Sequence, residues 1–279
     1  MSYTERHTID ELFARYELEP TLRDVYVEGK FDCEVLERHF PIESAGFVFY
    51  EIDTVDIPPA ELKAHGLTDG CKHRVICLSR KLATIKGNPA YRCLVDRDLD
   101  HWIGTLEATP RLVWTAYCSL ELYFFDQITL STIITTTAKA KIPSFSEFIG
   151  SFTVVLGDLY SMRLADRELG WSMKWLAPDK SLSISGSIVS FDTDDFVNRL
   201  LLKNGRAAKK KLFVENFSGW RTKVVGDPRL AIRGHDFIEL VGWSVGKFGG
   251  HKSFAHAESI ERLLVLLADR QTSLSGLLP

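Results

Sequence analysis

The first 117 residues alternate short apolar runs with longer segments of helical periodicity. Apolar runs at 25–27, 47–52, 92–95 and 112–116 are short enough to predict buried strands. Between the first and third runs, segment 32–40 and a second segment at about 71–85 carry apolar residues at helical spacing. Strands that alternate with crossover helices are typical of an α/β fold with a mostly parallel sheet flanked by helices.

The chain changes in character after residue 119 and becomes mainly helical. Segment 181–191 is the exception, because it alternates apolar and polar residues around Gly186 and predicts a hairpin or an edge strand. We therefore expect an α/β domain at 1–130 and a mainly helical C-terminal region at 131–279. We expect one helix at 121–128, just before that region. Within the region the expected helices are 144–164, 194–203, 207–217, 233–247 and 256–270. At the other end of the chain, Thr8 and Glu11 form a capping-box pattern that predicts the start of a helix.

Composition places the chain among ordinary globular proteins. It has 279 residues, of which 45% are hydrophobic and 25% charged, which excludes global disorder, collagen and coiled-coil arrays. The polar first ten residues hold no secretory signal, and no apolar run is long enough to span a membrane. Five cysteines without a CxxC pair indicate reduced thiols, so we expect a cytoplasmic protein with no membrane association.

Acidic residues follow two of the predicted strands. Glu28 comes after the first, and Asp96, Asp98 and Asp100 come after the third. The carboxyl ends of parallel strands line the ligand crevice of an open α/β sheet, and the carboxylates of Asp96 and Asp98 would share one face of an extended segment. Such a set selects Mg²⁺ or Mn²⁺. The alternative is that the aspartates cap a helix or form an Asx turn and that Glu28 is solvated.

These acidic residues carry a resemblance to a known domain. Val27-Glu28-Gly29-Lys30-Phe31-Asp32 resembles the first motif of the TOPRIM domain, and Asp96-Arg97-Asp98 resembles its Asp-x-Asp motif. The domain occurs in topoisomerases, primases and nucleases of the OLD group. The resemblance implies a TOPRIM-like fold in which Glu28 serves in proton transfer or metal binding and the aspartates hold Mg²⁺.

Two later motifs are similar to a narrower TOPRIM-related family that includes AriB, the effector subunit of the PARIS anti-phage system. They are Tyr117-Cys118-Ser119-Leu120-Glu121-Leu122-Tyr123 and Ile232-Arg233-Gly234-His235-Asp236-Phe237. The resemblance implies an ATPase sensor subunit like AriA as partner and a set of metal ligands. That set comprises Glu28, Asp96, Asp98, Asp100 and Glu121. No residue matches the second-site Lys of OLD nucleases.

The basic residues are concentrated between positions 203 and 252. The net charge of the chain is −3, whereas this segment holds 11 Lys and Arg against 4 Asp and Glu, a balance of +7. A run of cations is commonly a solvated helix face, and His235 could likewise be a structural histidine that binds no ligand. The functional interpretation is a phosphate-binding track, with Trp220 available to stack on an unpaired base. Its candidate residues are Lys30, Lys209, Lys210, Lys211, Arg221, Lys223, Arg233 and His235.

These features favour a metal-dependent TOPRIM nuclease with Glu28, Asp96 and Asp98 as catalytic residues. We expect an anti-phage effector that cleaves nucleic acid, with RNA such as tRNA favoured. The alternatives are a non-catalytic nucleic-acid-binding or scaffold subunit and an enzyme of the primase or topoisomerase branch. The apolar stripe at 260–267 and the leucines at 274, 277 and 278 are the expected surfaces for the ATPase or for a homodimer.

Overall fold

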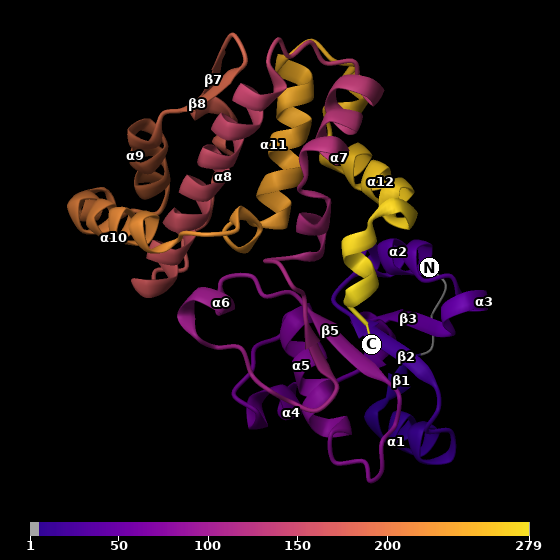
Figure 1. The fold of residues 1–279 in the computed structure, drawn as a ribbon. Coiled ribbons are helices and arrows are strands. Elements are labelled where there is room, and N and C mark those ends of the chain that lie inside the picture. Colours follow the sequence, from indigo (N-terminus) through magenta and orange to yellow (C-terminus); the bar gives the residue numbers. More distant parts are fainter. Residues whose placement is uncertain (1–5, 279) are drawn as a thin grey trace. The chain divides into compact units, whose positions relative to one another are not determined.

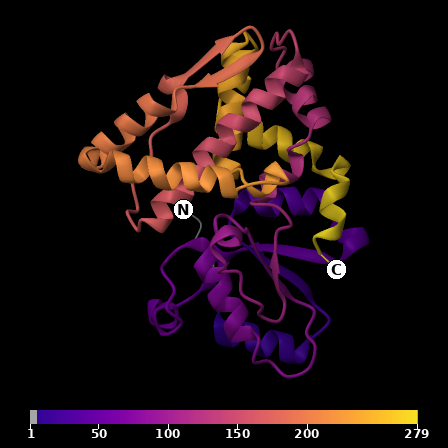
Figure 2. The same ribbon diagram turned by 60° about the vertical axis from the view of Figure 1, so that its left-hand side comes forward.

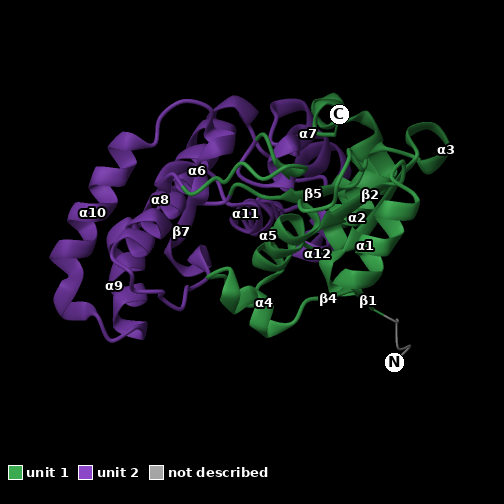
Figure 3. Ribbon diagram, turned by 90° about the horizontal axis from the view of Figure 1, so that it is seen from below, with its two compact units in different colours: residues 1–97, 105–116, 262–279 green, residues 98–104, 117–261 purple. Residues whose placement is uncertain are grey.

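The structure, a computed structural model, describes residues 6–278, so residues 1–5 of the polar N-terminal stretch lie outside the described part. The chain divides into two compact units, which Figure 3 colours separately. Unit 1 comprises the residues up to Arg97, residues 105–116 and those from Arg262 on. Unit 2 comprises 98–104 and 117–261. The boundary expected near residue 130 thus falls inside unit 2, and the last 18 residues belong to unit 1.

Unit 1 is built on a four-stranded parallel sheet, which confirms the predicted α/β class with helices beside parallel strands. Its strands are β2 (Arg23–Val27), β3 (Phe47–Glu51), β5 (Arg92–Val95) and β6 (Leu112–Trp114). The strand order is β3-β2-β5-β6, and β2, β3 and β5 lie side by side in Figure 1. A second, two-stranded parallel sheet pairs β1 (His7–Thr8) with β4 (Val55–Asp56).

Helices cover both faces of the main sheet because its central strands are apolar on both sides. Tyr26 and Cys93 belong to a buried cluster with α1 (Ile9–Leu18) and α5 (Cys71–Leu82). Phe47 and Phe49 instead contact Phe40, just after α2 (Lys30–His39). Since successive side chains of a strand point to opposite faces, this division follows directly from the sequence of each strand. The helices of unit 1 are α1 (Ile9–Leu18), α2 (Lys30–His39), α3 (Ile42–Ala45), α4 (Pro59–Ala64) and α5 (Cys71–Leu82).

The C-terminal segment of the chain packs within unit 1. His39 bonds the Ala268 carbonyl at 2.8 Å, and Arg38 pairs with Asp269 at 3.2 Å. The leucines expected to form a docking surface are buried, with exposed fractions of 0%, 6% and 6% for Leu274, Leu277 and Leu278. The tail therefore packs within its own unit, and the expectation that the three leucines form an exposed docking surface is wrong.

Unit 2 is a helical assembly around the long helix α8 (Phe145–Glu168), and Figure 2 shows it from a second direction. Two strands, β7 (Leu182–Ser185) and β8 (Ile188–Phe191), pair antiparallel, which confirms the predicted hairpin. Gly186 has a φ of +60°, the left-handed conformation that a two-residue hairpin turn requires. The helix expected at 121–128 is instead a 3₁₀ helix at Leu120–Phe124 followed by a short α-helix. The helices of unit 2 are α6 (Asp100–Ile103), α7 (Gln127–Ser131), α8 (Phe145–Glu168), α9 (Thr193–Lys203), α10 (Lys210–Lys223) and α11 (Gly234–Lys247), with α12 (Ala257–Leu267) crossing into unit 1.

A buried ion pair joins α8 to α11. Arg163 donates two hydrogen bonds to the Asp236 carboxylate, at 2.8 and 2.6 Å, and its guanidinium lies 4.1 Å from the centre of the Trp175 ring. The two side chains are only 14% and 6% exposed. Two hydrogen bonds in a fixed planar geometry set the rotation of one helix against the other.

Among residues 6–278, no helix combines the length and the apolar character of a membrane span.

Arg163→Ala is expected to destabilise unit 2 by roughly 3–5 kcal/mol, because it leaves the Asp236 carboxylate buried with its main partner removed. Chemical denaturation measures the loss. The matched control is Lys211→Ala, which removes a 92% exposed partner of Glu215 and should change stability by less than about 0.5 kcal/mol. Similar losses in the two variants would contradict the role assigned to Arg163.

Candidate active site

Glu28 occupies the turn between β2 and α2. The preceding residues of β2 are buried, and Gly29 follows as the N-cap of α2. Asp32 in the first turn of α2 accepts a hydrogen bond from the Gly29 N–H at 3.1 Å. The Glu-Gly-x-x-Asp spacing therefore has a local physical meaning, because the aspartate closes the turn that presents Glu28.

The structure brings Glu28 to the start of the Asp-x-Asp segment. Tyr26 is paired with Cys93 in parallel register, so β2 and β5 end almost level. The Asp96 N–H donates a hydrogen bond to the Glu28 carboxylate Oε1 at 3.0 Å. The prediction that Glu28 and Asp96 lie at the same edge of the sheet is confirmed.

Contacts to the neighbouring strand fix the chain beyond Asp96. The Thr115 N–H donates to the Val95 carbonyl at 3.0 Å, and the Arg97 N–H donates to the Thr115 hydroxyl oxygen at 3.2 Å. The Arg97 guanidinium also donates to the Thr115 carbonyl. Arg97 thus holds β5 and the residues after β6 together, a role that the motif alone did not reveal.

Cys71, the first residue of α5, is a neighbour of this edge that sequence reasoning did not select. Burial raises the pKa of its thiol, and the negative charges of Asp53 and Glu28 raise it further. Arg74 acts in the opposite direction. The thiol is therefore held in its protonated form among carboxylates, which argues against a nucleophilic cysteine here.

The donor chemistry of Glu28 and Asp96 fits a hard divalent cation. Carboxylate oxygens are the ligands that Mg²⁺ takes, and one or two of them commonly suffice when substrate phosphates and waters complete the coordination. No group of three or more His, Cys, Asp and Glu that could hold a metal is found within residues 6–278.

Asp98 begins unit 2 and has an unusual backbone. Its φ is +43°, a left-handed conformation that costs energy in a residue other than glycine. Bonds from its own unit hold it there: its N–H donates to the Cys118 carbonyl at 2.7 Å, and its carbonyl accepts from Tyr160 Oη at 2.6 Å and Cys118 Sγ at 3.2 Å. The segment is therefore not extended. The extended conformation that would turn the Asp96 and Asp98 carboxylates to one face was predicted wrongly.

Glu121 lies against the first residue of α11. A Cβ placed on Gly234 would come within 2.3 Å of both Glu121 Oε2 and Ser119 Oγ. Burial raises the pKa of the Glu121 carboxyl, and the Ser119 hydroxyl opposes that rise. The charges of Asp98 and Glu261 raise it further. The two later motifs thus meet in space, and the glycine of the second leaves room for the carboxylate of the first.

The predicted metal ligands accordingly form two sets within the described chain. Glu28 and Asp96 are joined in unit 1, whereas Asp98 and Glu121 influence each other in unit 2. Asp100, the first residue of α6, belongs to unit 2 and contributes to the raised pKa of Tyr160.

The predicted cationic track is only partly available to phosphates. Lys209 is exposed, and Lys211 is 92% exposed with Glu215 at 4.0 Å, whereas Lys210 pairs closely with Asp194. Most of the remaining candidates also have an acidic neighbour. These pairs are Lys30 with Glu34 at 3.7 Å, Arg221 with Asp158 at 2.8 Å, Arg233 with Asp236 at 3.9 Å and His235 with Glu239 at 3.0 Å.

Trp220 is not the exposed stacking platform that the sequence suggested. It is 9% exposed, and its indole N–H donates to the Glu168 carboxylate. Lys223 Nζ lies 4.7 Å from the centre of its ring. Trp220 therefore anchors α10 against α8, and the expectation that it stacks on a nucleobase is wrong.

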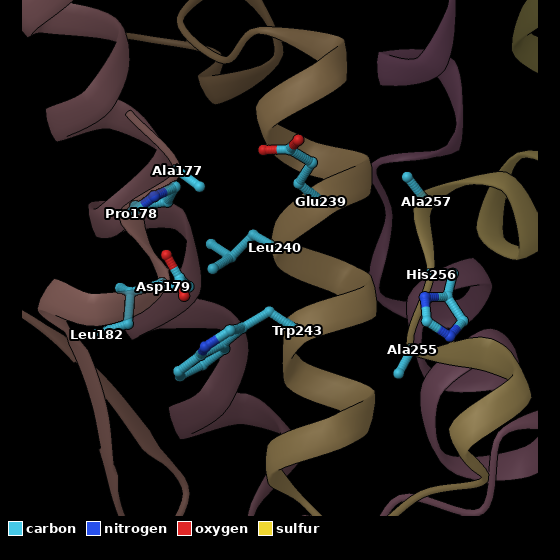
Figure 4. A pocket seen from close by; sticks show the side chains of 10 residues that line it. All are labelled: Ala177, Pro178, Asp179, Leu182, Glu239, Leu240, Trp243, Ala255, His256 and Ala257. Atoms are coloured by element: carbon cyan, nitrogen blue, oxygen red, sulfur yellow. The ribbon is translucent and has the colours of Figure 1, made fainter. Parts of the chain in front are cut away.

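Unit 2 also contains a cavity of about 320 Å³ beside α11, shown in Figure 4. Trp243, Leu240 and Glu239 line it from the helix, and Asp179 faces them from the segment before β7. His235 already binds Glu239 on the same helix. The cavity contains none of the predicted catalytic or metal-binding residues.

No family model matches the sequence, and a search of curated proteins gives no match.

Gly234→Ala is expected to lower stability by about 1–3 kcal/mol, because the new methyl group must displace the Glu121 side chain and the buried Ser119 side chain. Gly219→Ala in α10 is the matched control, since no described atom lies within 4 Å of its added Cβ. That control should gain up to about 1 kcal/mol from helix propensity. Denaturation curves of the two variants measure the difference, and an equal gain in both would contradict the contact.

Proposed function

We propose that this chain is a metal-dependent nuclease, a phosphodiester hydrolase of the TOPRIM type. The observation that carries the proposal is the 3.0 Å hydrogen bond that joins Glu28 to the Asp96 amide where β2 and β5 end. Ligands of open α/β sheets bind at this edge, beyond the carboxyl ends of the strands. The resemblance of the two acidic motifs to the TOPRIM domain supports the same assignment.

The proposed roles follow from how each side chain is held. Glu28 accepts the Asp96 N–H through one oxygen, which orients its carboxylate to take a proton from an attacking water. Asp96 is the second proposed carboxylate ligand, and Asp32 and Arg97 keep the two turns in place. Mg²⁺ or Mn²⁺, when bound, would supply polarisation of the scissile phosphate and a lower pKa for the bound water.

We further propose that the nuclease is an anti-phage effector that an ATPase sensor subunit keeps inactive until infection. This part rests on the similarity of the motifs around Glu121 and Gly234 to the AriB-containing family. RNA such as tRNA is the favoured substrate, and a homodimer is the proposed active form. Because Leu274, Leu277 and Leu278 are buried, the ATPase must bind a different surface.

A non-catalytic nucleic-acid-binding subunit is the second candidate. Its supporting observation is the left-handed backbone of Asp98, which removes the extended conformation that would turn the Asp96 and Asp98 carboxylates to one side. The two candidates differ in one measurable property, which is cleavage that depends on Glu28.

Glu28→Gln is expected to reduce Mg²⁺-dependent cleavage of tRNA and single-stranded RNA by about 100-fold or more. The glutamine amide oxygen can still accept the Asp96 N–H, so the variant removes the charge while it keeps the hydrogen bond. Cleavage is measured with gel-purified RNA, with and without the co-expressed ATPase and with EDTA as the metal-free reference.

Glu37→Gln is the control, because Glu37 is an exposed acid on α2 of the same unit. It should cut at the wild-type rate. If Glu28→Gln also cuts at that rate, the catalytic assignment is wrong, and if the wild type never cuts, the binding subunit becomes the preferred function.

The double variant Lys209→Gln/Lys211→Gln is expected to weaken RNA binding about equally for all sequences. Removing one cation from a phosphate of a single strand reduces the slope of log K against log salt by about 0.7, so the pair should reduce it by about 1.4. Lys210→Gln is the control and should change the slope less, because Asp194 already neutralises Lys210. Fluorescence polarisation across a salt series measures both slopes, and an unchanged slope in the double variant would assign these lysines to a solvated helix face.

A further inference from the structure

A second cavity of unit 2, of about 280 Å³, lies between α8, the end of α10 and the loop that follows it. Asp158 and Gly157 line it from α8, Arg221 from α10, and Val225 and Gly226 from the loop. Its volume is near the lower limit of about 300 Å³ for ligand pockets, so it suits a small ligand such as one mono- or bicyclic heterocycle. Gly226 has a φ of +105°, so the tight bend of the loop depends on glycine.

The floor of the cavity holds an incompletely compensated charge. Asp158 is 5% exposed, and Arg221 Nε lies 2.8 Å from its Oδ1. Burial raises the pKa of the Asp158 carboxyl, and the Arg221 charge opposes that rise. Arg221 itself is 53% exposed. Within the described part of the chain Asp158 forms this one ion pair, so a ligand that donates hydrogen bonds would stabilise the buried carboxylate further.

Two exposed apolar side chains also line the cavity. Val154 on α8 is 56% exposed and Val225 in the loop is 74% exposed, although both are large hydrophobic side chains. Burying such surfaces against the flat face of a ring removes apolar area from water. The cavity thus combines apolar surface with the Asp158–Arg221 pair, a combination that suits a planar heterocycle. Thr153, Ser161 and Asp227 also line it, and Asp227 is paired with Arg229 at 2.7 Å.

The charges of the pair select the ligand. Arg221 repels a cation and Asp158 repels an anion, so a neutral group with both donors and acceptors fits best. Side by side, the guanidinium offers donors and the carboxylate offers two acceptors, which reproduces the pairing edge of cytosine. The complementary edge presents one acceptor followed by two donors.

We propose that this cavity binds a guanine base of single-stranded RNA, with Asp158 accepting from N1–H and the 2-amino group and Arg221 donating to O6. Among the common bases, guanine has two adjacent donors beside an acceptor on its pairing edge, whereas adenine, cytosine and uracil each present a single donor there. Unpaired bases are read in this way by proteins that recognise RNA loops.

The inference rests on the proposed nuclease function in one respect, namely that the bound guanine belongs to the RNA that is cut. Binding itself involves unit 2 alone and needs no cleavage. It can therefore be measured in the Glu28→Gln protein, and its outcome is independent of the outcome for catalysis.

The test is calorimetric titration of the Glu28→Gln protein with guanosine, inosine and adenosine 5′-monophosphates. Inosine lacks only the 2-amino group, so the proposal expects guanosine monophosphate to bind about ten-fold or more tightly than inosine monophosphate. An added Asp158→Asn substitution should abolish that preference. An added Arg221→Gln substitution should weaken both nucleotides alike, because both carry O6.

Asp194→Asn, which alters an ion pair on α9 outside the cavity, is the control and should leave all affinities unchanged. Thermal melts of each variant establish that it is folded. Absence of nucleotide binding by the folded protein, equal affinity for the guanosine and inosine nucleotides, or a preference that survives Asp158→Asn would overturn the proposal. If the preference is found while the Glu28 test fails, unit 2 binds guanine in a protein that is not a nuclease.

Discussion

The level ends of two parallel strands are the constraint on which the candidate site depends. β2 and β5 are adjacent, and Tyr26 is opposite Cys93, so the Asp96 N–H reaches the Glu28 carboxylate. A slip of one residue would turn each apolar side chain of a strand to the opposite face. The register that buries the core thus also brings the Glu28 carboxylate to the backbone of Asp96, and no further contact is needed to align the two strand ends.

Unit 2 depends on a different principle. Ion pairs and hydrogen bonds compensate its buried acidic side chains and hold a strained backbone inside a helical assembly. Asp236 is held by Arg163, and the left-handed Asp98 is held through its backbone by Cys118 and Tyr160. A strained backbone persists only where its surroundings over-determine it, and such residues cluster at functional sites. Glu121 and the first residue of α11 belong to the same arrangement, since only glycine leaves space for the carboxylate.

The charges on the helices of unit 2 divide into those that build the fold and those that remain for a ligand. Lys210 and Arg233 have acidic neighbours, whereas Lys209 is exposed and Lys211 is largely in solvent, with Glu215 at the 4.0 Å limit of an ion pair. A balance of +7 in the segment therefore overstates the charge that a phosphate backbone would meet. The Arg221 and Asp158 pair is distinct, because one partner is buried beneath a cavity and the other is half exposed.

The sequence by itself determined the parallel sheet, the hairpin around Gly186, the capping box at Thr8 and the position of Glu28 and Asp96 at one edge, because each follows from local periodicity or turn chemistry. It could not determine which neighbours cover an apolar or aromatic side chain. Trp220 and the C-terminal leucines resemble exposed binding groups in sequence, yet long-range packing buries them. Only the tertiary structure decided the backbone of Asp98, the contact between Glu121 and Gly234 and the cavity above Asp158, since each joins residues far apart in the chain. Hydrophobic periodicity predicts which face of a helix or strand is apolar, whereas the packing of the elements determines which neighbour covers that face.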